Sequence, residues 1–307
     1  MNKIIIAVLI CLFGQILYSQ ERHIVTSDSV DLYVEVKGQG APCLYIHGGP
    51  GSGSYWFEKF YGETMEKHFT VIYLDQRGVA RSGSPENGNF SLGRMIKDFE
   101  EIKNALGYDT WFTLGHSFGG ILQLAYAEMY PKSQDGLMMI NTTLHLNKSF
   151  CESWAPKAFE FLREEYVGCD NDTLPLMERM GYLGNRLREK DLFWKMAYFN
   201  KENQAIMDAT FQEIENWNFD FGGVAFSIED YWMDFLPQTQ HVTAPVLFFY
   251  GETDYMVGPK HYKEVKFPNM LLWKNQGGHI PFQENQKELT EAILTFKKKV
   301  EDSPIRS

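Results

Sequence analysis

The sequence predicts an α/β fold: a mostly parallel sheet covered by helices on both faces, with a helical segment inserted between two of its strands. Short, nearly continuous apolar runs alternate with longer segments whose apolar residues recur at helical spacing. This alternation is typical of parallel strands buried between two layers of helices. It stops between about residues 144 and 242, a stretch rich in aromatic residues with 17 acidic and 9 basic side chains, and then resumes.

The elements of the first half follow from local patterns. Residues 23–38 alternate apolar and polar side chains around a turn at 27–29, which predicts a β-hairpin. Apolar runs at 42–47, 69–75 and 110–116 predict buried strands. Residues 91–107 carry apolar side chains at helical spacing, with Ser91 as the expected N-cap, and 119–130 form an apolar helix ended by Pro131.

The second half of the chain contains further predicted strands and a closing helix. Strands are predicted at 135–141 and 244–251, and a further strand begins at about Leu271. The segment 285–301 predicts a closing helix, because its acidic residues come early and its lysines late, as the helix dipole favours. We interpret residues 144–242 as mostly helical. Because the alternation of strands and helices resumes after them, we infer an insertion between two strands of one sheet.

The first 19 residues have the layout of a secretory signal peptide. Lys3 precedes an apolar run from Ile4 to about Leu17, and the small Ser19 follows. The run is shorter than a membrane-spanning helix and is interrupted by glycine and glutamine. We expect cleavage after Ser19, export to the periplasm or out of the cell, and no stable membrane insertion once the leader is removed.

Composition argues against several classes of function. The net charge of −11 disfavours a nucleic-acid partner, which requires a basic face. No CxxC or HExxH spacing suggests a metal site, and no dinucleotide or phosphate-binding loop suggests a cofactor. We therefore expect neither metal nor cofactor, and the oligomeric state stays open. Cys43 lies in an apolar strand and is expected to be a buried thiol, whereas pairing of Cys151 with Cys169 stays open.

A G-x-S-x-G pattern is formed by Gly115, Ser117 and Gly119. An apolar strand precedes it and a helix follows, which is the context of a nucleophile elbow, a sharp turn that lifts a serine hydroxyl above the sheet. An ordinary glycine-rich turn would show the same letters. The assignment of Ser117 as a nucleophile therefore depends on finding a base and an acid.

Two polar residues follow the last two strands in the required order of acid and then histidine. Asp254 lies just after residues 244–251, and His279 follows two glycines after the last strand. A serine hydroxyl needs a histidine to take its proton and an acid to orient that histidine. Glu252 is the main alternative acid, although it lies very close to the strand end, and His261 is a weaker candidate base.

The stretch HGGPG, residues 47–51, directly follows a strand. Acyl-transfer enzymes stabilise an oxyanion with backbone N–H groups, one from the residue after the nucleophile and one from such a loop. We expect these donors to be Phe118 and Gly49, with Gly49 favoured over Gly48. The Gly49–Pro50 peptide bond can adopt the cis form, and the sequence leaves this open.

Three motifs together resemble the proline iminopeptidases, which are serine peptidases of the α/β-hydrolase fold. They are HGGPG at 47–51, DQRGVARS at 75–82 and GHSFGG at 115–120, and the resemblance covers about residues 40–140 and 243–300. It implies a catalytic domain from 20–143 and 243–307 and a helical cap domain over the site from 144–242. It also implies the roles given above and a bracing role for Asp75 and Arg77. Ala80 replaces the family's usual second glycine, and Phe118 stands where the family often has tryptophan or tyrosine.

The resemblance implies that acidic side chains hold the free amino terminus of a substrate. No cap residue matches a family position, so Glu213, Glu215, Glu229 and Asp230 are candidates by charge alone, with Gly48 and Trp232 as further substrate contacts. The function hypothesis is an exported serine aminopeptidase that releases an N-terminal residue, first of all proline, from short peptides. An esterase or other small-molecule hydrolase with the same triad is the alternative, and a binding module without catalysis is disfavoured by the complete residue set.

Overall fold

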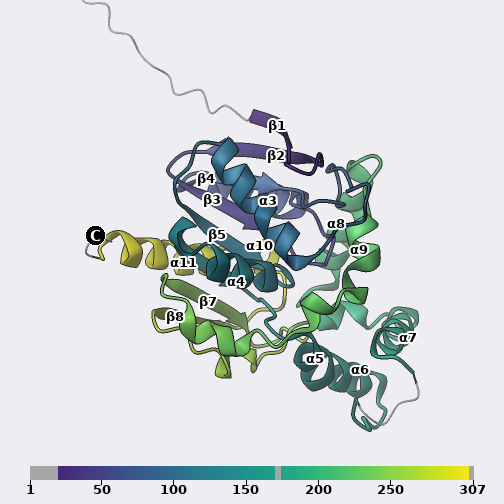
Figure 1. Cartoon of the computed structure of the whole chain (residues 1–307). Coiled ribbons are helices and arrows are strands. Elements are labelled where there is room, and N and C mark those ends of the chain that lie inside the picture. The colour runs from purple at the N-terminus through teal and green to yellow at the C-terminus, as the bar shows by residue number, and fades with distance from the viewer. Residues whose placement is uncertain (1–19, 170–173, 304–307) are drawn as a thin grey trace, which may run out of the picture.

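The computed structural model describes residues 20–169 and 174–303, so the predicted signal peptide lies outside the described residues. An eight-stranded sheet with the strand order β1-β2-β4-β3-β5-β6-β7-β8 forms its centre (Figure 1). β1 and β2 pair antiparallel, as do β2 and β4, and the remaining neighbours are parallel. The strands are β1 (Gln20–Val25), β2 (Asp31–Gly38), β3 (Ala41–Ile46), β4 (Phe69–Leu74), β5 (Trp111–His116), β6 (Gln134–Ile140), β7 (Val246–Gly251) and β8 (Met270–Asn275). The predicted mostly parallel α/β sheet is confirmed.

Side chains alternate between the two faces of the sheet, and each face has its own layer of helices. In β3, Leu44 and Ile46 belong to one hydrophobic cluster, whereas Cys43 and Tyr45 belong to the other. The first cluster is covered by α3 (Leu92–Ala105) and α4 (Gly119–Met129). The second is covered by α11 (Gln286–Glu301) and by the short turns α1 (Tyr55–Phe57), η1 (Glu58–Gly62) and α2 (Glu63–Met65).

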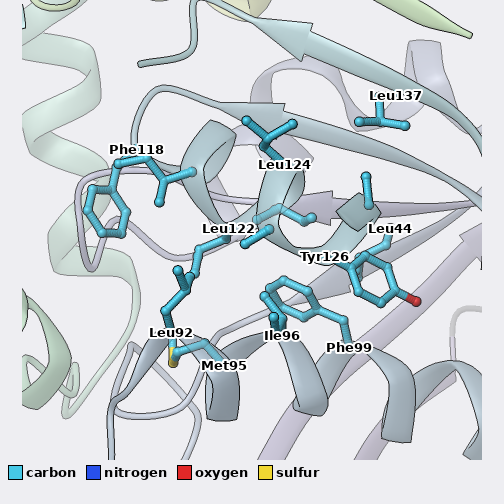
Figure 2. Close-up of a cluster of buried hydrophobic side chains, with 14 of the residues drawn as sticks. Leu44, Leu92, Met95, Ile96, Phe99, Phe118, Leu122, Leu124, Tyr126 and Leu137 are labelled. Carbon is cyan, nitrogen blue, oxygen red and sulfur yellow. The ribbon is translucent and has the colours of Figure 1, made fainter. Parts of the chain in front are cut away.

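Figure 2 shows how α3 and α4 meet over the first face. Leu92, Met95, Ile96 and Phe99 project from α3 toward side chains of α4, and all four are buried. Phe99 packs edge-to-face against Tyr126 of α4, with ring centroids 5.6 Å apart. Burial of each such side chain stabilises the fold by about 1.5–3 kcal/mol, so this contact fixes α4, the helix that follows the predicted nucleophile.

Residues 141–245, here called the inserted segment, connect β6 to β7. Its described part consists of short helices and turns and adds no strand to the sheet. Figure 1 shows α5, α6 and α7 grouped beside the sheet rather than on either of its faces. The helices are α5 (Leu146–Lys148), η3 (Ser149–Trp154), α6 (Ala155–Leu162), α7 (Leu176–Glu189), η4 (Phe193–Met196), α8 (Lys201–Thr210), η5 (Phe211–Glu213), α9 (Asp220–Val224), η6 (Ala225–Ser227), η7 (Glu229–Trp232) and η8 (Leu236–His241).

The inserted segment has a small hydrophobic core of its own, which includes Trp154, Leu183 and Met196. A disulfide joins Cys151 to Cys169, which answers the question that the sequence left open, and Cys43 is a buried free thiol as expected. Within residues 20–169 and 174–303, no helix has the length and apolar character needed to cross a membrane.

The remaining elements are η2 (Pro131–Ser133), η9 (His261–Lys263) and α10 (Pro281–Glu284). Ser91 occupies the predicted N-cap position of α3, but its side chain makes no capping hydrogen bond and donates to Asn89 instead. The helical turns at 55–65 were not expected from the sequence.

Ala80 shows why glycine is usual at its position. Its φ is +48°, in the left-handed region, which glycine adopts freely and other residues adopt at a cost. Two backbone hydrogen bonds hold it there, because its N–H donates to Asn218 at 3.0 Å and its carbonyl accepts from the same residue at 2.9 Å. These bonds attach the inserted segment to the 75–82 loop.

We expect Ala80→Gly to leave the free energy of unfolding unchanged or raised by up to about 1 kcal/mol, because glycine tolerates this conformation. We expect Ala80→Val to lower it by about 2 kcal/mol or more, because a β-branched residue at positive φ is strained and the site is buried. Urea unfolding of the two variants tests this. Equal stabilities for glycine and valine would contradict a role for backbone conformation here.

The 75–82 loop is braced by buried ion pairs, as the resemblance implied. Arg77 is fully buried, with Nε 2.6 Å from Asp98 and Nη1 2.8 Å from Asp28. The hydrogen bonds from Arg77 hold the pKa of Asp28 well below its usual range. Asp75 accepts from the backbone and side chain of Ser54, each at 2.8 Å, and therefore connects this loop to the segment that follows HGGPG.

Candidate active site

Ser117 lies in a sharp turn between β5 and α4. Its φ of +55° is strained for a serine, and crowding explains the glycines around it. A Cβ at Gly119 would lie 2.3 Å from the carbonyl oxygen of Ile46, and one at Gly115 would lie 2.4 Å from Oε1 of Gln123. The backbone contact makes glycine necessary at 119, whereas a side chain at 115 would force Gln123 to move.

Ser117, His279 and Asp254 form one chain of hydrogen bonds. Nε2 of His279 lies 2.9 Å from Oγ of Ser117, and Nδ1 lies 3.0 Å from Oδ2 of Asp254. A carboxylate only accepts, so Nδ1 carries the proton and Nε2 is free to accept from the hydroxyl. Asp254 is itself oriented, because its Oδ1 accepts from the backbone N–H groups of Met256 and Val257. The structure therefore brings together the three residues that the sequence analysis selected.

The two rival residues lie elsewhere. Glu252 is exposed and pairs with Lys274, Oε1 to Nζ, at 2.6 Å. His261 is buried and accepts a hydrogen bond from the N–H of Leu144 at 3.0 Å. Neither residue takes part in the hydrogen bonds of Ser117.

The HGGPG loop lies directly against the elbow. A Cβ at Gly48 would lie 2.7 Å from Cβ of Ser117 and 3.1 Å from the nitrogen of Phe118. Gly49 has a φ of +109°, and the Gly49–Pro50 peptide bond is cis. In the described part of the chain, the N–H groups of Gly48, Gly49 and Phe118 have no hydrogen-bond partner. Gly48 and Phe118 lie next to Ser117, and the assignment of Gly49 and Phe118 as the oxyanion donors stays a prediction.

Aromatic side chains from the inserted segment surround Phe118. Its ring lies 6.4 Å from that of Phe226 and 5.2 Å from that of Tyr231. Trp232, a predicted substrate contact, packs on Phe226 at 6.0 Å, and its Nε1 donates to the Phe226 carbonyl. The surroundings next to the elbow are therefore strongly apolar.

The candidate acids of the inserted segment lie on its surface. Glu213 pairs with Lys59 and also accepts from the hydroxyl of Tyr55. Glu215, Glu229 and Asp230 are exposed. Among the described residues, none of these four acids contacts Ser117 or His279, and binding of a substrate amine by any of them stays a prediction.

Two residues that the sequence analysis passed over touch the loop of His279. Nε2 of His116 lies 2.8 Å from the carbonyl oxygen of His279, and Nδ2 of Asn141 donates to the carbonyl of Gly278 at 2.7 Å. The sequence could have pointed to these residues only through their positions, because His116 directly precedes Ser117 and Asn141 directly follows β6.

Three buried histidines make stability depend on pH. Burial lowers the pKa of His47 to about 4, of His116 to about 3 and of His261 to about 4. In the unfolded chain these groups bind protons below about pH 6.5. Their contribution to stability is therefore complete above about pH 6.5 and is lost as the pH falls toward 4, by up to about 1.4 kcal/mol per pH unit for each histidine.

We expect the free energy of unfolding in urea to fall between pH 7 and pH 5. His261→Gln should be less stable at pH 7 but lose less on acidification, because one buried neutral imidazole is gone. His23→Gln is the matched control for loss of an imidazole, since that side chain is 53% exposed and its removal should change stability by no more than about 0.5 kcal/mol. A wild-type slope in His261→Gln would contradict the assignment.

A family model of the alpha/beta hydrolase fold matches residues 42–286. The chain belongs to the α/β-hydrolase family. This α/β-hydrolase is 32% identical to the proline iminopeptidase of Neisseria gonorrhoeae over 124 residues, which is 38% of either chain. The aligned region thus spans under two fifths of that relative's length.

Two longer matches cover nearly the whole α/β-hydrolase. The proline iminopeptidase of Saccharolobus solfataricus is 25% identical over 277 residues, 85% of this chain and 86% of the relative. The crystal structure of a proline iminopeptidase-related protein from Thermus thermophilus superposes with a TM-score of 0.74 at 19% identity, covering 92% of this chain and 99% of the other. The predicted resemblance to the proline iminopeptidases of this fold is confirmed.

No group of three or more metal-ligating side chains is positioned to hold an ion within residues 20–169 and 174–303 of this α/β-hydrolase.

Proposed function

We propose that this α/β-hydrolase is a serine hydrolase in which Ser117 is the nucleophile, His279 the general base and Asp254 the acid that orients it. The observation that carries the proposal is the continuous hydrogen-bond chain from Ser117 through His279 to Asp254. His279 takes the hydroxyl proton as Oγ attacks the substrate carbonyl, and later returns it to the leaving group. Phe118 and Gly49 donate to the oxyanion.

We propose further that the substrate is a short peptide with a free amino terminus, from which the enzyme releases the first residue, preferably proline. The similarity to proline iminopeptidases over 85% of the chain supports this choice. Residues 144–242, which make up most of the inserted segment, act as a cap domain over a catalytic domain of residues 20–143 and 243–307.

An esterase is the second candidate, and one observation favours it. A protonated amine that leaves water for an aromatic pocket needs a charged partner. Yet the four candidate acids are exposed, and Glu213 is already paired with Lys59. An enzyme that accepts neutral acyl substrates would need no such acid.

Proline 4-nitroanilide, its N-acetyl derivative and 4-nitrophenyl butyrate separate the two functions. We expect the free-amine anilide to be turned over with a kcat/KM at least about 100-fold above that of the acetylated one, because acetylation leaves the amine-binding carboxylate unpaired. Turnover of the butyrate ester without turnover of any aminoacyl anilide would replace the peptidase proposal by the esterase.

Export by the predicted leader, with cleavage after Ser19, belongs to the same proposal. The Cys151–Cys169 disulfide supports it, because such bonds form and persist in oxidising compartments. The amino terminus of the mature protein, read by sequencing after expression in the source cell, tests the cleavage site.

A further inference from the structure

The backbone around His279 is held from three directions. The Gly278 carbonyl accepts from Nδ2 of Asn141 at 2.7 Å. The N–H of His279 donates to the carbonyl of Ala197, in the inserted segment, at 2.6 Å. The carbonyl of His279 lies 2.8 Å from Nε2 of His116. Three consecutive backbone groups beside the base are thus bonded to the end of β6, the inserted segment and the end of β5.

The surroundings of His116 favour a hydrogen bond from its ring to the carbonyl of His279. Its ring lies between those of His279 and Phe282, at centroid distances of 4.7 and 5.1 Å, and it is 6% exposed. Burial lowers its pKa to about 3, so the ring is neutral at physiological pH. Its single proton lies on Nε2, because the partner is a carbonyl that only accepts. A neutral donor holds His279 without opposing the positive charge that the base acquires.

Asn141 makes the second contact from a constrained backbone. Its φ of +48° lies in the left-handed region, which asparagine tolerates better than most residues. Its own N–H donates to the carbonyl of Phe249 in β7 at 2.9 Å, and the residue is 2% exposed. The side chain is therefore directed at Gly278 by a backbone that is itself fixed between two strands.

We propose that His116 and Asn141 are positioning residues for the base: they hold Nε2 of His279 against Oγ of Ser117 through hydrogen bonds to its own and the preceding carbonyl. The proposal rests on the proposed role of Ser117 as the nucleophile. Neither residue has a contact with Ser117 Oγ, so their effect is on the rate of the chemical step rather than on substrate binding. A displacement of about 1 Å in a catalytic group can cost about 100-fold in rate.

Three substitutions separate the hydrogen bonds from packing. His116→Phe keeps a ring between His279 and Phe282 but removes the donor, whereas His116→Gln places an N–H donor near the position of Nε2. Asn141→Gly removes the amide and at the same time relieves the left-handed conformation. Asn216→Gly is the matched control, because Asn216 also has a positive φ, of +55°, but is exposed and lies in a surface turn.

The readouts are the rate of Ser117 labelling by a fluorophosphonate, kcat and KM on the best anilide or ester, and the low-field NMR signal of the His279 Nδ1 proton. We expect His116→Phe and Asn141→Gly to slow labelling and kcat by about 10- to 100-fold, with KM changed by less than about threefold. The Nδ1 signal should broaden or shift in both. His116→Gln should recover most of the rate, and Asn216→Gly should match the wild type.

Wild-type labelling rates and an unchanged Nδ1 signal in folded His116→Phe or Asn141→Gly would overturn the inference. If His116→Phe does not fold, Asn141→Gly and His116→Gln still decide the question. A wild type that is not labelled at Ser117 would instead refute the proposed nucleophile. A wild type that is labelled but prefers esters would change only the substrate, so the two failures are distinguishable.

Discussion

Ser117→Ala is expected to remove nearly all turnover, with a loss of about 10⁴- to 10⁶-fold in kcat. Losses of this size follow when the nucleophile of a serine hydrolase is deleted while the oxyanion donors remain. His279 then has no hydroxyl to deprotonate, and no acyl-enzyme can form. Hydrolysis of the best anilide or ester by purified protein measures the loss.

We expect the same substitution to keep the fold intact, so that the loss of turnover reports on chemistry rather than on unfolding. Ser117→Gly should even be more stable than Ser117→Ala, because φ is +55° at this position and only glycine adopts it without cost. Thermal unfolding of the two variants tests that order. Activity in Ser117→Ala within about 100-fold of the wild type, or fluorophosphonate labelling at another residue, would refute the triad.

Asp254→Asn is expected to lower kcat by about 10⁴-fold, because an amide in place of the carboxylate favours the wrong imidazole tautomer. The variant retains the size of the side chain and an oxygen that can accept from Met256 and Val257. The loss therefore reports on the bond to Nδ1 of His279 rather than on the loop.

Glu252→Gln is the matched control for Asp254→Asn. It is the same loss of a carboxylate in the same loop, but Glu252 is exposed and bonded to Lys274. We expect less than about a twofold change in kcat and a change in stability within about ±0.5 kcal/mol, as is usual for an exposed ion pair. A larger loss of activity in Glu252→Gln than in Asp254→Asn would reverse the assignment of the acid.

The strands and long helices could be predicted because their signal is local. Apolar runs such as 69–75 and helical spacing in 91–107 follow from burial on a sheet or a helix face, and the structure places β4 and α3 there. The helical turns at 55–65 were missed, because they are short and include a π-helical turn, so no clear period arises. For the inserted segment, only the helical character could be predicted. The arrangement of its helices depends on contacts with the 75–82 loop and with the loop of His279, which the sequence does not show.

The site could be predicted where a motif ties a residue to a strand end, and not where only tertiary contacts decide. Ser117 and His279 each follow a strand that the sequence reveals, and a parallel sheet brings such ends together. By contrast, the ion pair between Glu213 and Lys59 joins residues far apart in the sequence. The sequence shows that both side chains are charged, but not that they lie together. The positions of Asn141 and His116 at strand ends were the only signal for them, and their hydrogen bonds could not be predicted, because these depend on which carbonyl lies within reach.

The insertion between β6 and β7 affects when the candidate site can be completed during synthesis. These strands are neighbours in the sheet, yet residues 141–245 separate them. Each doubling of a connecting loop costs only about 0.6 kcal/mol, so the insertion is tolerated in the finished molecule. A growing chain, however, has presented Ser117 and the edge of β6 long before Asp254 and His279 exist. With the proposed triad, a chain that ends before β8 lacks His279, and we therefore expect no hydrolysis until β7, β8 and the residues after them have joined the sheet.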